Sequence, residues 1–310
     1  MKQKIALILA ALAVFCSCGP SHKLEETDNV YSKMDDIMFI KYCQDFLDPN
    51  RDDVLSMEEA AAVDAIRIPA LYNVSSLKGI EYFTGLSTLS CARNPLKSID
   101  LSGNAALTEL DCSGTQISSL DLSGNKALKV LECDDLQISS LDLSKNGKLE
   151  HLACSGTLLS SLGLSKNKAL KYLNCNNSAL SSLDLSKNKA LAELYCRDNK
   201  LSSLDMSGNK ALKKMECQRN RLSSLVLSGN VELASLDCAD NRLSELDISE
   251  TKLFLTEYEN FVAEIYELQK MDSFRQKVPM TLYMRQSQYD RIYEEFDDGF
   301  KILEIKAVVR

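Results

Sequence analysis

The sequence predicts a solenoid of short stacked coils with parallel β ladders, capped by a helical segment at the N-terminus and a small α/β segment at the C-terminus. The main observation is a 21-residue repeat. Its eight in-register units begin at Leu86, Leu107, Leu128, Leu149, Leu170, Leu191, Leu212 and Leu233. One unit cannot bury its leucines alone, so neighbouring units must stack to make a continuous core. The composition, 310 residues of which 45% are hydrophobic, supplies enough apolar residues for one elongated domain.

The N-terminus, residues 1–17, has the features of a secretory signal, because two lysines precede an apolar run too short to span a membrane. The cysteine that follows this run, Cys18, resembles the lipidated residue of a bacterial lipoprotein. That resemblance implies a lipid anchor at Cys18, with Cys16 as a competing position. An ordinary secreted protein with stray cysteines is the alternative. Residues 18–32 are then expected to form a polar tether.

Residues 33–65 are predicted to form a helix–loop–helix, because apolar side chains recur at helical spacing on both sides of a twelve-residue acidic loop. Oxygen ligands at alternating positions could come from Asp48, Asn50, Asp52, the backbone carbonyl of Val54, Ser56 and Glu59. A hard cation takes about six to eight such oxygens. The loop resembles an EF-hand or a dockerin half-motif, which implies a structural Ca²⁺ ion. Asp53 stands where that motif has glycine, so an acidic turn without metal is the alternative.

Residues 66–253 form the repeat, preceded by an irregular opening coil. The working consensus of a unit is L-x-x-L-x-C-x-x-N-x-L-x-x-L-D-L-S-x-N-x-A, in which L-x-C and L-D-L each predict a short strand followed by a turn. This pattern resembles the leucine-rich repeat family, and most closely the 21-residue class of Bacteroidetes-type surface proteins. The resemblance implies a solenoid that binds its partners through one variable face.

Two columns of polar residues recur in the units. The asparagines at the end of each unit (Asn104, Asn125, Asn146, Asn167, Asn188, Asn209, Asn230) are expected to satisfy backbone groups at turns. The cysteines (Cys91, Cys112, Cys133, Cys154, Cys175, Cys196, Cys217, Cys238) are expected to point inward. Disulfides and metal binding are alternatives, but parallel coils give poor bridge geometry, and no Cys-x-x-Cys or histidine partner is nearby. We therefore interpret them as small buried apolar residues.

A binding surface is expected where the units differ. The second half of each unit repeats the same serines, aspartates and lysines, which is typical of a solvated scaffold face. The residues around L-x-C vary, and the candidate surface comprises His151, Tyr172, Asn174, Glu193, Tyr195, Arg197 and Arg219. Tyrosine and arginine are enriched at binding hot spots. Ordinary surface variation is the alternative.

Residues 254–310 leave the repeat, and their pattern predicts helices near 256–268 and 289–296 and two strands in a small α/β cap. The function expected from the family resemblance is a cell-envelope lipoprotein, exposed at the outer membrane, that binds a protein or glycan and is monomeric. A spacer that presents the C-terminal segment is the alternative. The net charge of −8 argues against nucleic acid, and two histidines make a catalytic or histidine metal site improbable, so no enzyme is expected.

Overall fold

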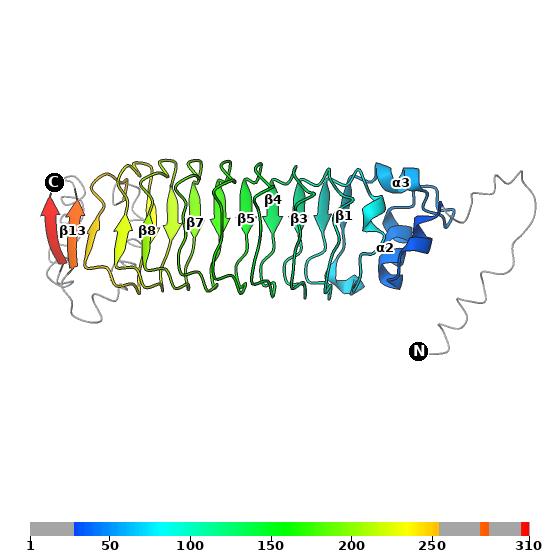
Figure 1. Ribbon diagram of the computed structural model, residues 1–310, viewed down its shortest axis with the longest axis horizontal. Coiled ribbons are helices and arrows are strands. Elements are labelled where there is room, and N and C mark those ends of the chain that lie inside the picture. Colours follow the sequence, from blue (N-terminus) through cyan, green and yellow to red (C-terminus); the bar gives the residue numbers. More distant parts are fainter. Residues whose placement is uncertain (1–27, 254–279, 285–304, 310) are drawn as a thin grey trace, which may run out of the picture.

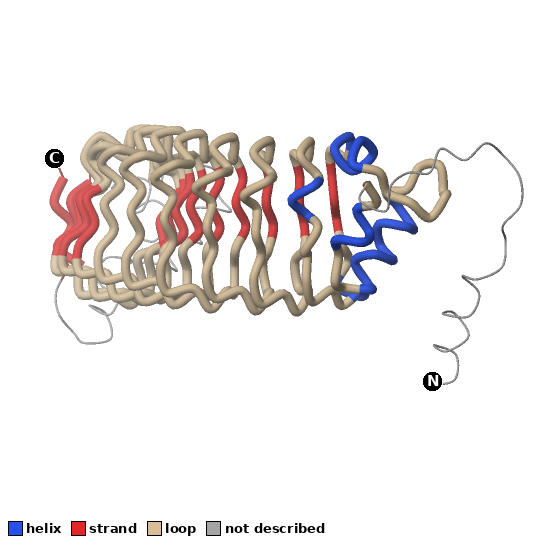
Figure 2. The backbone as a smooth tube through the Cα atoms, turned by 45° about the vertical axis from the view of Figure 1, so that its right-hand side comes forward, coloured by secondary structure: helices blue, strands red, loops and turns tan. Residues whose placement is uncertain are grey.

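The structure is a computed structural model that describes residues 28–253, 280–284 and 305–309. Its coils stack along one axis, with two helices at one end and the last strands at the other (Figure 1). Most of each coil is loop, and the strands are short segments aligned along the stack (Figure 2). The eight predicted units are therefore eight successive turns of one solenoid.

The L-x-C segments form the main ladder, which we call the front sheet. It has nine parallel strands: β1 (Ala65–Arg67), β2 (Thr88–Ser90), β3 (Glu109–Asp111), β4 (Val130–Glu132), β5 (His151–Ala153), β6 (Tyr172–Asn174), β7 (Glu193–Tyr195), β9 (Lys214–Glu216) and β11 (Ser235–Asp237). The central residue of each strand is buried and pairs with its counterpart in the next turn, as Leu152 does with Leu173. From β2 onward the register advances by one 21-residue unit per strand.

The prediction of a second strand in every unit was wrong for most of the chain. In the described repeats the L-D-L segments form strands only in the last three turns, as β8 (Ser203–Asp205), β10 (Ser224–Val226) and β12 (Glu245–Asp247). These are the consecutive turns in which Asn199, Asn220 and Asn241 occupy the consensus position after cysteine. Each of their side-chain oxygens accepts a backbone N–H from the preceding turn, which fixes neighbouring turns together on this side.

The C-terminal strands continue this second ladder. β13 (Met280–Met284) pairs in parallel with β12, and β14 (Ile305–Val309) pairs in parallel with β13. The two predicted C-terminal strands therefore exist, but they extend the solenoid. The two predicted C-terminal helices lie outside the described residues.

The N-terminal end is a helical cap. A 3₁₀ turn η2 (Val30–Lys33) precedes α2 (Ile37–Phe46) and α3 (Met57–Ala62), and two further 3₁₀ turns follow, η3 (Ala70–Tyr72) and η4 (Ile80–Tyr82). Two boundaries differ from expectation. Val30 and Tyr31 are buried, so the polar tether cannot extend to residue 32. The second helix ends at Ala62, because Ala65–Arg67 pairs with β2 as the first ladder strand.

The core is one continuous column of leucines with a cysteine beside each front strand. All eight repeat cysteines are buried, which confirms the inward position predicted for them. Burial raises the pKa of the seven thiols from Cys91 to Cys217, and the pKa of Cys196 rises to about 12. These thiols are therefore protonated packing groups at neutral pH.

The asparagines at the end of each unit form a buried ladder, as expected. The Asn167 side-chain nitrogen donates to the carbonyls of Leu143 and Asn146 in the preceding turn, at 3.1 and 2.8 Å. The same two bonds recur from Asn104 to Asn230. We call this column the asparagine ladder, and it joins each turn only to its predecessor.

Candidate functional site

The outward side of the front sheet displays two side chains per strand, on either side of the buried central residue. Because the strands are parallel and in register, residues at equivalent positions line up from turn to turn. His151 pairs with Tyr172, which pairs with Glu193, which pairs with Lys214. A second row on the same face contains Asn174, Tyr195 and Glu216. The candidate binding residues of β5, β6 and β7 therefore share one face, as predicted.

Three rings on this face make a continuous contact, which we call the aromatic stripe: His151, Tyr172 and Tyr195. The rings of His151 and Tyr172 stack with centroids 4.2 Å apart and an interplanar angle of 3°. Tyr172 and Tyr195 follow at 5.4 Å and 41°. Tyr195 belongs to the second row of the face, so the stripe crosses three strands diagonally. All three rings are half-buried, because each is covered partly by its neighbour.

Charged side chains terminate the aromatic stripe at both ends. At one end the His151 Nε2 atom lies 3.8 Å from a carboxylate oxygen of Glu132. At the other end the Lys214 ammonium lies 5.0 Å from the centre of the Tyr195 ring, a cation–π contact. The Tyr195 hydroxyl donates to Glu193 at 2.8 Å. Glu132 and Lys214 were not among the predicted site residues, although their register beside the tyrosines follows from the repeat.

The side of the stripe near β3 and β4 is acidic. Burial, followed by the nearby Asp111 carboxylate, raises the pKa of Glu132. Burial also raises the pKa of Asp134, although a hydrogen bond from the Ser155 backbone opposes it. The aromatic stripe therefore lies between a negative region on one side and, on the other, the Lys214 cation, which also pairs with Glu216 at 2.9 Å.

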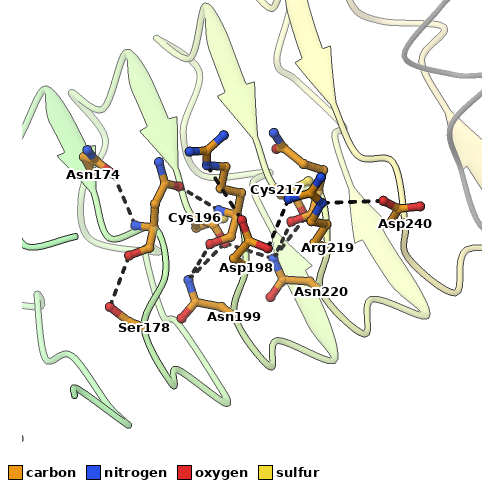
Figure 3. A network of polar contacts seen from close by, with 12 residues as sticks. Asn174, Ser178, Cys196, Asp198, Asn199, Cys217, Arg219, Asn220 and Asp240 are labelled. Atoms are coloured by element: carbon orange, nitrogen blue, oxygen red, sulfur yellow. Dashed lines mark hydrogen bonds and ion pairs between the residues drawn. The ribbon is translucent and has the colours of Figure 1, made fainter. Parts of the chain in front are cut away.

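The two predicted arginines lie in a separate polar network at the ends of the strands, in which Figure 3 shows Arg219 beside Asp198 and Asp240. The Arg219 guanidinium lies between Asp198 and Asp240, 3.7 Å from a carboxylate oxygen of each. Arg197 lies 3.8 Å from Asp198. Asn174 accepts a backbone N–H two residues on, so it supports its own loop. The structure thus unites His151, Tyr172, Tyr195 and Glu193, and places both arginines at the edge of the face.

Backbone geometry explains why charged residues crowd that edge. The eighth residue of every unit has a positive φ, and the position is held by Arg93, Gly114, Asp135, Gly156, Asn177, Asp198, Arg219 and Asp240. Glycine, asparagine and aspartate take up this conformation most readily. The turn therefore supplies Asp198 and Asp240 in the units on either side of Arg219, and both lie close to its guanidinium.

The acidic loop of the N-terminal cap makes the left-handed turn that an EF-hand-like loop needs at its sixth position. Asp53 adopts φ 62°, the left-handed conformation that glycine provides in the motif. Asp48, Asn50 and Asp52 each accept a backbone N–H from within the loop. The Asn50 amide nitrogen lies 2.9 Å from Glu59 and 3.2 Å from Asp52. The carboxylates of Asp52 and Glu59, two of the predicted ligands, therefore both accept a hydrogen bond from the Asn50 amide.

The other predicted ligands of the loop support α3. Ser56 caps the helix and exchanges hydrogen bonds with Glu59 in a capping box. Val54 follows at the loop's end, where its N–H donates to Asp52. Within the described residues, no three His, Cys, Asp or Glu side chains lie close enough together to hold a metal as they stand. To bind calcium, the carboxylates of Asp52 and Glu59 would have to give up their hydrogen bonds from the Asn50 amide and coordinate the cation.

The parallel register of one strand per 21 residues, together with the buried asparagine ladder, decides the fold. The chain is a leucine-rich repeat solenoid. It is similar to the functional domain of InlJ from Listeria monocytogenes, which includes a cysteine ladder; the two are 28% identical with a TM-score of 0.66 over 84% of this chain. The chain spans 57% of the length of that InlJ domain.

Two further bacterial structures share the leucine-rich repeat solenoid. An internalin (inlF) from Listeria monocytogenes is 16% identical, with a TM-score of 0.59 over 91% of this chain and 93% of that one. A leucine-rich repeat protein of Leptospira interrogans is 18% identical, with a TM-score of 0.56 over 69% and 61%. No protein-family model and no curated protein sequence matches the chain. The similarity therefore rests on the structure.

The predicted signal and Cys18 lie outside the described residues. Among the helices that the structure describes, none has the length and apolar character to cross a membrane.

Proposed function

We propose that this leucine-rich repeat solenoid is a binding protein whose partner is a protein that docks on the aromatic stripe. The observation that carries the proposal is the run of three contacting rings, held in register on adjacent strands and flanked by charges of both signs. The strands fix the rings before binding, so little side-chain entropy remains to be lost. Rigid tyrosines of this kind supply much of the binding energy at protein interfaces.

The double substitution Tyr172→Ala and Tyr195→Ala tests this proposal. We expect it to weaken partner binding by at least 2 kcal/mol, on the order of a 30-fold loss, because it removes two central aromatic contacts. The measurement is retention of partners from envelope and host-cell extracts on immobilised protein, followed by titration of the recovered partner. Circular dichroism should be unchanged, since both side chains lie outside the core.

A matched control removes exposed apolar side chains from elsewhere on the solenoid. Val226 and Val231 are 38% and 51% exposed. The double substitution to alanine at these positions should leave partner retention intact. If the tyrosine variant also retains every partner, the protein is better described as a spacer that presents its C-terminal segment, and the binding proposal fails.

We further propose that the protein is exported and anchored in the cell envelope, at the outer membrane, through lipid on Cys18. The similarity to bacterial internalins supports a role outside the cytoplasm, and the apolar run before Cys18 supports export. Labelling cells with a radioactive fatty acid tests the anchor. Label should be absent from a Cys18→Ser variant and retained in a Cys16→Ser variant.

The acidic loop is proposed to bind one structural Ca²⁺ ion, because its donors are oxygen atoms and Asp53 already has the left-handed turn. We expect calorimetric titration of the protein to show one site, and Glu59→Gln to abolish the heat, since glutamine lacks the bidentate carboxylate. Glutamine still supports the capping box, so α3 should survive. The neighbouring exposed Glu58 provides the control, and Glu58→Gln should bind normally. Absence of heat from the unaltered protein would make the loop a metal-free turn.

A further inference from the structure

One longitudinal edge of the solenoid is densely basic. It consists of the loops that lead into five successive front strands, residues 123–129, 144–150, 165–171, 186–192 and 207–213. They carry eleven exposed lysines: Lys126, Lys129, Lys145, Lys148, Lys166, Lys168, Lys171, Lys187, Lys189, Lys210 and Lys213. The only carboxylate in these loops is Glu150, which pairs with Lys171 at 2.6 Å. We call this surface the lysine edge; it stands out on a protein whose net charge is −8.

The backbone that carries these lysines is fixed by the asparagine ladder. Lys166 and Lys168 flank Asn167, whose side chain is buried and bonded to the preceding turn at two carbonyls. Lys187 and Lys189 flank Asn188 in the same way. The lysines therefore stand in columns that repeat at the strand spacing of ~4.8 Å. A ligand that follows the axis would meet positive charge at every turn without ordering a loop first.

The lysine edge is narrow because negative charge borders it. The L-D-L segments immediately before the loops carry Asp121, Asp142, Asp184 and Asp205, all exposed. Hydrogen bonds from the serine two residues later lower the pKa of each of these carboxyls, so all four are ionised at neutral pH. On the other side lies the front sheet, where Glu193 is the carboxylate in the row next to these loops and Glu132 lies at the far end of β4. The positive surface is thus a strip along the axis between two carboxylate-bearing faces.

We propose that the lysine edge binds a linear anionic polysaccharide that lies along the solenoid axis. A single polysaccharide chain is narrow enough to touch the lysine columns alone. A planar anionic membrane or a nucleic-acid duplex is broader, and would bring its charges against the flanking aspartates, where like charges repel. None of the eleven lysines belongs to the aromatic stripe, although Lys171 directly precedes Tyr172 in the chain.

Binding of polygalacturonate, a linear sugar polymer with one carboxylate per residue, to the full-length protein tests the proposal. We expect binding at low salt that weakens steeply as salt is added, because the polymer releases counterions when lysines neutralise it. The triple substitution Lys145→Gln, Lys166→Gln and Lys187→Gln removes one column. Each lysine next to an anionic surface contributes about fivefold to the affinity, so the loss of three should weaken binding roughly 100-fold. The affinity of the variant should also depend less steeply on salt concentration.

Two controls make the outcome specific. A variant with Lys78, Lys97 and Lys200 changed to glutamine has the same net charge as the first triple variant, but its lysine edge is intact. It should therefore bind polygalacturonate as the unaltered protein does. The tyrosine double variant should also bind normally, which separates this proposal from the protein-binding one. Neutral dextran should not bind.

Three results would overturn the proposal. The first is no binding of polygalacturonate by the unaltered protein at low salt. The second is an equal loss in the two triple-lysine variants, which would indicate net charge as the cause. The third is binding to vesicles of anionic phospholipid that is tighter than binding to the polysaccharide, which would assign the edge to a membrane.

Discussion

Replacing Asn167 by aspartate is expected to destabilise the solenoid by about 3–5 kcal/mol at neutral pH, the usual cost of leaving a charge buried without a partner. Asn167 is fully buried, and its side-chain nitrogen donates to the carbonyls of Leu143 and Asn146. An ionised carboxylate in the same place has no hydrogen to donate and faces two carbonyl oxygens. The loss should appear in urea denaturation followed by circular dichroism.

The pH dependence distinguishes this cause from a packing defect. The introduced carboxyl should have a higher pKa in the folded protein than the value of about 3.9 in the unfolded chain. Its cost is therefore largest above the folded pKa and shrinks as the pH falls, because the protonated group can donate again. Asn177→Asp is the matched control, since Asp135 and Asp198 occupy the equivalent turn position in other units. If the loss of unfolding free energy in Asn167→Asp is the same at pH 7 and pH 5, a buried charge is not its cause.

Asp36→Ala is expected to cost on the order of 3 kcal/mol and to release the N-terminal cap from the first coil. One carboxylate oxygen of Asp36 accepts the N–H groups of Met38 and Phe39 at the start of α2. The other accepts the backbone N–H and hydroxyl of Ser75, each at 2.7 Å, and the N–H of Ser76. Alanine would leave all five donors without this acceptor.

The same carboxylate should make the stability of the cap depend on pH. Burial alone would raise the pKa of Asp36, but the hydrogen bonds from Ser75, Phe39 and Met38 outweigh it and lower the pKa. Its stabilising effect is therefore full above the unfolded pKa of about 3.9 and is lost as the pH falls through the folded value. Hydrogen exchange of α2 at pH 7 and pH 3 measures this. The exposed Asp35→Ala is the control; if it loosens α2 equally, Asp36 has no special role.

The periodic features could be predicted from the sequence because each recurs in seven or eight units. The 21-residue register, the buried cysteines and the asparagine ladder follow from letters that recur at fixed positions, and the structure confirms them. The distribution of the second ladder could not be predicted from L-D-L, which is nearly the same in every unit. Its strands coincide with Asn199, Asn220 and Asn241, whose side chains bond to the turn before.

The candidate site was predicted in part for a similar reason. The placement of Tyr172 and Tyr195 on one face follows from the repeat. The stacking of His151 on Tyr172 and the diagonal contact with Tyr195 depend on side-chain rotation. The pairing of Arg197 and Arg219 with Asp198 depends on the left-handed turn at the eighth position. The consensus does not reveal that turn, because arginine occupies it as well as glycine and aspartate.

The asparagine ladder has a genetic consequence. Each asparagine bonds only to the turn before it, so no bond depends on the total number of turns. Unequal recombination that deletes or duplicates the codons of one whole unit would preserve every remaining bond. Loss or gain of a fraction of a unit would shift the next ladder asparagine out of register, so its buried amide would no longer face the carbonyls of the preceding turn. Alleles of this gene in related strains should therefore differ in length by whole units, and a change that involves one of the five lysine-bearing turns would alter their number in one step.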